Sequence, residues 1–137
     1  MNNVKVAGIL PDNYDPLKDE EYMSQYMLRY FKNLLANTLD KILQKENQIS
    51  HSIMEESIIR ADYIDQGGEE ELRHNEFTFL EFENIRRIET EKALDRINNG
   101  DYGYCLETGD PIGIKRLIIV PTAKYTLEIQ EIKEKSH

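Results

Sequence analysis

The chain has 137 residues, of which 39% are hydrophobic and 31% charged, and its formal net charge at pH 7 is −9. This length suits one domain, or one small globule with an extended element. No apolar run is long enough to span a bilayer, and the N-terminal residues lack the basic and apolar regions of a secretion signal. A single cysteine cannot form an internal disulfide. We therefore expect a cytoplasmic protein with no membrane partner.

The negative charge is concentrated in the middle of the chain. Residues 19–100 hold 18 acidic and 10 basic side chains, a balance of −8, whereas residues 101–137 hold 6 and 5. Direct binding to the nucleic-acid backbone requires clustered Lys and Arg, so this charge distribution argues against direct DNA binding. A partner with a basic surface or a bound cation fits the charge better.

A long helix is predicted over residues 20–60, which contain neither Pro nor Gly, with Ser24 as a possible N-cap. Its most regular apolar residues recur at intervals of seven: Leu28, Leu35, Ile42 and Ile49. This stripe is typical of an amphipathic helix in a long two-helix packing. The stripe is imperfect, because Lys45, Glu46 and Ser52 stand where apolar residues would strengthen it.

A second helix is predicted from about residue 65 to residue 98, and Asn99-Gly100 ends it, with Gly100 in the left-handed C′ position. Its predicted apolar face consists of Leu72, Phe79, Phe82, Ile85, Ile88, Leu94 and Ile97. Two such helices joined by a short loop form an antiparallel hairpin, and the loop at residues 61–68 is its tip.

Residues 101–137 differ in composition from the two predicted helices. Turn residues alternate with short β-favouring runs between residues 101 and 114, which predicts a small β-hairpin, with Arg116 to Val120 as a possible strand. A last helix is predicted from about Thr122 or Thr126 to Lys135. The fold class is therefore mainly α. The predicted division is an irregular segment 1–18, a coiled-coil hairpin 19–100, and a globular domain 101–137.

Two acidic residues at the tip, Asp62 and Asp65, are the first candidates for a functional site. A carboxylate at a helix start can cap free N–H groups, and capping alone explains both positions. The alternative is an acidic probe that enters a site containing a cation or basic residues. Gly67 and Gly68 each destabilise a helix by roughly 1 kcal/mol relative to Ala, so they are a poor choice for stability alone.

Cys105 is the second candidate, as a zinc ligand or a reactive thiol. A zinc site needs four converging N or S ligands, and the chain has no second cysteine. No histidine lies near Cys105 in the sequence, and no activating environment for a catalytic thiol is evident. The preferred interpretation is a small buried hydrophobic residue. The basic residues nearby, including Lys115 and Arg116, could bind phosphate but are first explained as a solvated surface.

Four motifs resemble the DksA/TraR family of bacterial RNA polymerase regulators over nearly the whole chain, from about residue 20 to residue 135. They are Asp62-Tyr63-Ile64-Asp65-Gln66-Gly67, then Gly100-Asp101-Tyr102-Gly103-Tyr104-Cys105-Leu106-Glu107-Thr108-Gly109, then Pro111-Ile112-Gly113-Ile114-Lys115-Arg116-Leu117, and Pro121-Thr122-Ala123.

The resemblance implies a transcription factor that binds RNA polymerase rather than DNA. The family's hairpin enters the polymerase secondary channel, its acidic tip approaches the active site, and the stability of promoter complexes changes, often jointly with the alarmone ppGpp. The family's tip pattern is Asp-x-x-Asp-x-Ala. Asp62 and Asp65 match that pattern, whereas Gly67 departs from it.

The resemblance also implies a degenerate zinc finger. Zinc-binding members have four cysteines, and the matching positions here are Cys105, Thr108, Thr126 and Ile129. This combination is similar to the zinc-free branch of the family, so no zinc is expected. Among the basic residues that the family uses towards ppGpp, Arg116 matches, while Val120 and Gln130 do not.

Two alternatives remain open at this point. A Gre-like factor would use the tip acids to hold a metal for transcript cleavage during elongation. A helical-hairpin adaptor would bind another protein without any effect on transcription. No catalytic triad, phosphate loop or ligand set indicates an enzyme in its own right.

Overall fold

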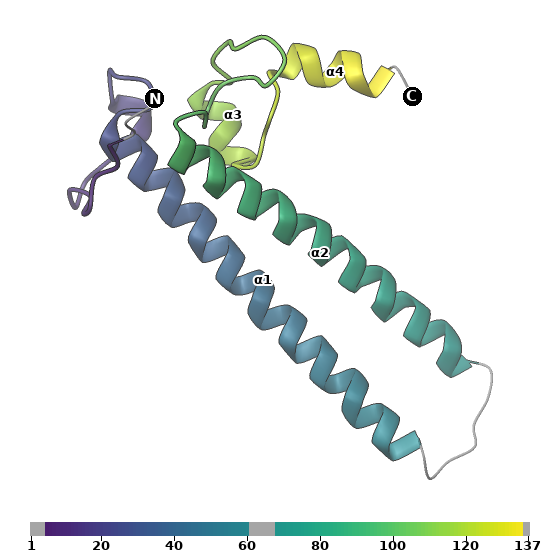
Figure 1. Ribbon diagram of the computed structural model, residues 1–137. Helices are drawn as coiled ribbons and strands as arrows, with labels where there is room; N and C mark the ends of the chain where they lie inside the picture. The colour runs from purple at the N-terminus through teal and green to yellow at the C-terminus, as the bar shows by residue number, and fades with distance from the viewer. Residues whose placement is uncertain (1–4, 61–67, 136–137) are drawn as a thin grey trace. The chain divides into compact units, whose positions relative to one another are not determined.

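The computed structural model describes residues 5–60 and 68–135, with the backbone alone for 57–60 and 68–77. In these residues a 3-10 helix, η1 (Pro16–Lys18), precedes the α-helices α1 (Gln25–Arg60), α2 (Gly68–Asn99), α3 (Ile114–Ile119) and α4 (Leu127–Lys135) (Figure 1). The predicted mainly α fold with a long helical hairpin is confirmed. No helix in the described ranges is long and apolar enough to cross a membrane.

The chain divides into two compact units. The hairpin unit is Thr38–Glu89, which holds most of α1 and α2. The globular unit is Met1–Asn37 together with Thr90–His137, and it contains the remaining parts of these two helices with η1, α3 and α4.

The start of α1 is set by two side chains. The backbone N–H of Met27 donates to Ser24 Oγ at 3.2 Å, so the predicted N-cap is confirmed. Asp19 accepts hydrogen bonds from the Ser24 hydroxyl and, at 3.0 Å, from the N–H of Glu21. Met23 has a positive φ of 54°. These turn contacts explain why the helix begins at Gln25 and not at about residue 20.

The end of α2 is a Schellman motif. Gly100 has a φ of +85°, and its N–H donates to the Ile97 carbonyl at 3.3 Å. The N–H of Asp101 donates to the Arg96 carbonyl at 2.9 Å. The predicted C′ position of Gly100 is thereby confirmed, because this geometry satisfies the last carbonyls of the helix with a left-handed residue.

The core of the globular unit is apolar and well packed. Its buried cluster comprises Met27, Leu28, Phe31, Leu35, Ala93, Ile97, Tyr102, Ile112, Leu117 and Ala123. The rings of Phe31 and Tyr102 lie 5.5 Å apart, and the Tyr102 hydroxyl donates to the Pro121 carbonyl at 2.7 Å. A large aromatic residue is thus fully buried with its polar group satisfied.

The β-structure predicted for the globular unit is wrong. Among the described residues, one isolated bridge between Tyr104 and Pro111 stands in place of the hairpin. The expected strand from Arg116 to Val120 is instead the helix α3 with its C-cap. The run Leu117-Ile118-Ile119-Val120 favours strands by composition, but Leu117 is fully buried in the helical core, and tertiary packing overrides that preference.

The apolar face predicted for α2 is also partly wrong. Phe82, Ile85 and Ile88 are 67%, 59% and 37% exposed, respectively. The buried positions of α2 include Glu83, Thr90 and Ile97, which are spaced by seven residues as the stripe of α1 is. A seven-residue spacing keeps residues on the side of a helix that faces its partner.

Candidate functional site

The loop from Cys105 to Gly109 occupies the place that the sequence compares with a zinc finger. The N–H of Gly109 donates to the Cys105 carbonyl at 2.8 Å, and the N–H of Cys105 donates to the Asp110 carbonyl at 2.8 Å. The N–H of Leu106 donates to the Lys124 carbonyl at 2.9 Å. Backbone hydrogen bonds therefore close this loop and tie it to the segment before α4.

The sulfur of Cys105 is buried within this loop, as the sequence predicts. Burial raises the pKa of the thiol, but hydrogen bonds from the Thr108 side chain and from the N–H groups of Thr126, Thr108 and Glu107 outweigh it. The pKa is lowered from 9.0 to about 7. These donors stabilise the thiolate, as hydrogen bonds to a charged form do.

The four positions that match a zinc finger lack the usual ligand set of a structural zinc site. Thr126 Oγ1 accepts a hydrogen bond from the N–H of Ile129 at 3.4 Å, as an N-cap of α4. Ile129 carries no donor atom, and one thiol with two hydroxyls is not the N and S set that structural zinc requires. Within residues 5–60 and 68–135 no group of three or more His, Cys, Asp or Glu side chains could hold a metal ion.

Protein contacts hold this region together. Lys133 of α4 makes an ion pair with Glu107 at 3.0 Å, and its ammonium lies 4.7 Å from the ring centroid of Tyr125. On the other side of the loop, the Tyr22 hydroxyl donates to the Gly103 carbonyl at 2.6 Å and accepts from the N–H of Gly113 at 3.1 Å. These side chains cross-link segments far apart in the sequence.

Arg116 is the residue that matches the family's basic set for ppGpp. It is half-buried, and its Nε donates to the Tyr125 carbonyl at 3.2 Å. It lines an open groove of ≈ 680 Å³ with Lys115 and mostly apolar residues. The exposed apolar residues of that lining are Leu17, Ile119, Val120 and Leu127. The groove is therefore more apolar than a phosphate site would be.

The predicted tip residues Asp62, Asp65 and Gly67 lie outside the described residues. The structure therefore leaves their predicted roles as predictions.

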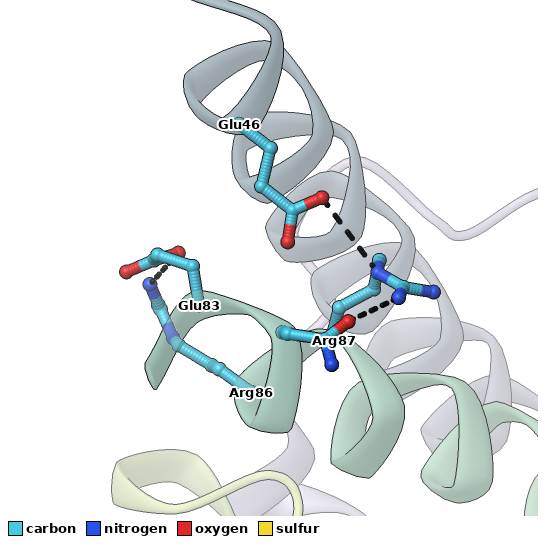
Figure 2. Close-up of polar contacts among 5 residues, drawn as sticks. Glu46, Glu83, Arg86 and Arg87 are labelled. Carbon is cyan, nitrogen blue, oxygen red and sulfur yellow. Dashed lines mark hydrogen bonds and ion pairs between the residues drawn. The ribbon is translucent and has the colours of Figure 1, made fainter. Parts of the chain in front are cut away.

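The hairpin unit contains a polar layer that the sequence analysis did not predict (Figure 2). Arg87 Nε of α2 lies 3.7 Å from Glu46 Oε2 of α1, with the side chains 29% and 21% exposed. Glu83 is buried, and its Oε2 lies 3.7 Å from Nη1 of Arg86 on the same helix. The seven-residue spacing of Glu83, Thr90 and Ile97 is the sequence signal for the buried side of α2, on which Glu83 lies.

Comparison with known proteins gives a consistent result. Residues 100–135 match the family model "Prokaryotic dksA/traR C4-type zinc finger". The chain is 34% identical over 123 residues to the RNA polymerase-binding transcription factor DksA of Caulobacter vibrioides, covering 90% of this chain and 87% of the relative. The chain belongs to the DksA family.

Two further relatives support the assignment to this family. The RNA polymerase-binding transcription factor DksA of Escherichia coli K12 is 30% identical over 145 residues, covering 98% of this chain and 90% of the relative. The solved structure of transcription factor DksA2 from Pseudomonas aeruginosa is 29% identical with a TM-score of 0.74. That match covers 86% of this chain and 91% of the solved chain. The DksA fold is thus shared, although the chain has one cysteine where the family model is named for four.

Proposed function

We propose that this chain is a regulator of transcription that binds RNA polymerase directly. The observation that carries the proposal is the similarity to relatives named RNA polymerase-binding transcription factors, which extends over 87% of the Caulobacter protein. The hairpin formed by α1 and α2 and the acidic charge of residues 19–100 support it, because complementary charge favours encounter with a basic channel.

In the proposed mechanism the hairpin enters the secondary channel, and Asp62 and Asp65 act at the tip. The protein shifts the population of polymerase–promoter states by binding one of them more tightly, and it performs no chemistry of its own. The proposed site of this action is the cytoplasm, where polymerase is. Residues 1–18, 19–100 and 101–137 are its proposed functional parts.

The test is the lifetime of open complexes at a ribosomal RNA promoter, with and without the purified protein. We expect a shorter lifetime with the protein. The Asp65→Asn variant, which removes one charge from the tip, should still bind polymerase and lose the effect. An unchanged lifetime with the native protein, or full activity of Asp65→Asn, would contradict the proposal.

Two further measurements separate related hypotheses. Release of RNA from a backtracked elongation complex would identify a Gre-like cleavage factor instead. Addition of ppGpp tests whether this alarmone acts with the protein, since Arg116 matches the family's basic set whereas Val120 and Gln130 do not.

The protein is proposed to fold and act without zinc. Two observations support this proposal. The side chains of Cys105, Thr108, Thr126 and Ile129 do not supply four zinc ligands, and backbone hydrogen bonds close the loop. Metal analysis of the pure protein checks the proposal, and one tightly bound zinc per chain would contradict it.

A further inference from the structure

The groove of the globular unit gathers exposed apolar side chains in one hollow. It is lined by η1, by α3 with the residues next to it, and by the first residue of α4. Ile119 is 81% exposed, and the other exposed apolar residues of the lining are Leu17, Val120 and Leu127. Single exposed apolar residues are normal on a protein surface, whereas several of them together mark an interaction site.

The walls of this groove are held in place by the core of the globular unit. Leu117 of α3 is fully buried, and Ile112, which lines the groove, is also part of the buried cluster. The helix α3 packs against η1. The hydrogen bond from Arg116 Nε to the Tyr125 carbonyl, at 3.2 Å, ties α3 to the segment before α4. A groove whose walls are fixed in advance loses little conformational entropy when a partner enters it.

The charge of the groove is opposite to that of the whole chain. The charged residues of its lining, Lys115 and Arg116, are both basic, whereas the chain has a formal net charge of −9. Lys115 is exposed and Arg116 is half-buried. A partner with acidic side chains is therefore complementary to this groove, and its apolar side chains would cover residues such as Ile119 and Leu127.

An amphipathic helix has the shape and the chemistry that this groove requires. Such a helix carries its apolar residues on one face, which lies in a hydrophobic groove, and its charged residues at the edges of that face. The open groove of ≈ 680 Å³ takes one face of a helix without enclosing it. A small phosphate compound would leave the exposed apolar lining uncovered, and a basic partner would meet like charges at Lys115 and Arg116.

We propose that the groove binds an acidic amphipathic helix of RNA polymerase, in addition to the contact that the hairpin makes. This inference rests on the proposed function, in which the hairpin enters the secondary channel. The groove contributes affinity, because a second contact made by a chain that is already bound forms at a high effective concentration. The tip residues contribute the effect on promoter complexes. Loss of the groove contact therefore weakens binding without removing the effect of the bound protein.

Binding of the full-length chain to purified cognate core polymerase, measured by biolayer interferometry, tests the groove. Ile119→Glu should raise the Kd about tenfold or more, because it places a carboxylate against an acidic and apolar partner. Leu127→Glu should do the same, and an acid at the start of α4 suits the helix dipole. Ile9→Glu is the matched control, since Ile9 is 85% exposed in the same unit but does not line the groove. Its Kd should equal that of the native protein, and circular dichroism should show native helix content in all three variants.

Two further measurements test the charge of the partner and the division between affinity and effect. Lys115→Glu should weaken binding, and more strongly at low salt than at high salt, because salt screens the contact between exposed charges. At concentrations that saturate polymerase, Ile119→Glu should shorten the lifetime of open complexes as the native protein does. Asp65→Asn should show the opposite behaviour, with native binding and no effect on the lifetime.

Several outcomes would overturn the inference and leave the proposed function standing. They are native binding by Ile119→Glu and Leu127→Glu, equal weakening by Ile9→Glu, and tighter binding by Lys115→Glu, which would show a basic partner. A native dimer in sedimentation that Ile119→Glu dissociates would assign the groove to a second copy instead. Loss of the lifetime effect in saturating Ile119→Glu would contradict the separate role of the groove. A native protein that does not bind polymerase would overturn the proposed function, and this inference with it.

Discussion

The globular unit and the hairpin unit use buried polar groups in opposite ways. In the globular unit the Tyr102 hydroxyl is buried and donates to the Pro121 carbonyl at 2.7 Å, beside a core of apolar side chains. In the hairpin unit Glu46 and Glu83 each keep a buried oxygen without a hydrogen-bond partner among the described residues. Buried polar groups stabilise when satisfied and destabilise when they are not.

This difference separates contacts that stabilise the folded protein from contacts that affect how its helices pair. Hydrogen bonds and apolar packing connect the segments of the globular unit, so this unit should be sensitive to loss of single contacts. In the hairpin unit, Glu46, Glu83 and Arg87 occupy buried or half-buried positions that apolar side chains could fill. Changes at these positions should alter the pairing of the helices more than the free energy of unfolding. The variants below test that contrast in order of decreasing expected effect.

The largest effect is expected from Phe31→Ala in the globular core, where Phe31 is fully buried. The lost apolar burial and the remaining cavity should lower the free energy of unfolding by about 3–5 kcal/mol. Phe82→Ala in the hairpin unit, where the ring is mostly exposed, should change it by less than about 0.5 kcal/mol. Urea unfolding measures both, and equal effects would remove the contrast between the units.

Gly103→Ala should destabilise the globular unit by about 1–3 kcal/mol, because an L-residue is strained at a φ of +92°. A Cβ at this position would also lie 2.8 Å from Cε of Met23. Gly109→Ala is the matched control, since Gly109 has a φ of +78° but no atom within 4 Å of a Cβ. Thermal unfolding should show a lower midpoint temperature for Gly103→Ala than for Gly109→Ala. The reverse order would mean that the contact with Met23 does not destabilise the Gly103→Ala variant.

Tyr102→Phe should cost about 1–3 kcal/mol, because it leaves the Pro121 carbonyl without its buried donor. Tyr26→Phe changes a tyrosine that is 39% exposed, and it should have little effect. Chemical unfolding of the two variants compares them. If Tyr102→Phe left the free energy of unfolding unchanged, water or another group would have to satisfy the Pro121 carbonyl.

The contribution of Cys105 to stability should depend on pH. Its thiol pKa is about 7 in the folded protein and 9.0 as the ordinary value, so the folded state releases the proton first. The stabilisation is complete above pH 9 and is lost as the pH falls through 7. The difference in unfolding free energy between the native protein and Cys105→Ser should grow from pH 7 to pH 9; a constant difference would contradict a stabilised thiolate.

A small change in stability is expected for the double variant Glu46→Leu/Arg87→Leu. Replacement of a partly buried ion pair by apolar residues is often neutral, and here it should stabilise by no more than about 1 kcal/mol. Urea unfolding measures the effect. A loss of several kcal/mol would show that the pair makes a net contribution to the stability of the hairpin.

Local sequence signals determined the helical hairpin and its ends. The seven-residue stripe of α1, the cap at Ser24 and the left-handed Gly100 each act over a few neighbouring residues, so they could be read directly. The absence of a zinc ligand set at Cys105 and its counterparts also follows from residue identity alone. The tip residues Asp62 and Asp65 remain predictions, because they lie outside the described residues.

The tertiary structure alone decided two features. The run Arg116 to Val120 favours strands by composition, yet it forms the end of α3 because Leu117 packs into the core. On α2, apolar residues spaced by three, such as Phe82, Ile85 and Ile88, drift around the helix by about 60° per step, so composition does not define one face. Which side is buried depends on contacts with α1, and the Glu46–Arg87 ion pair is one of them.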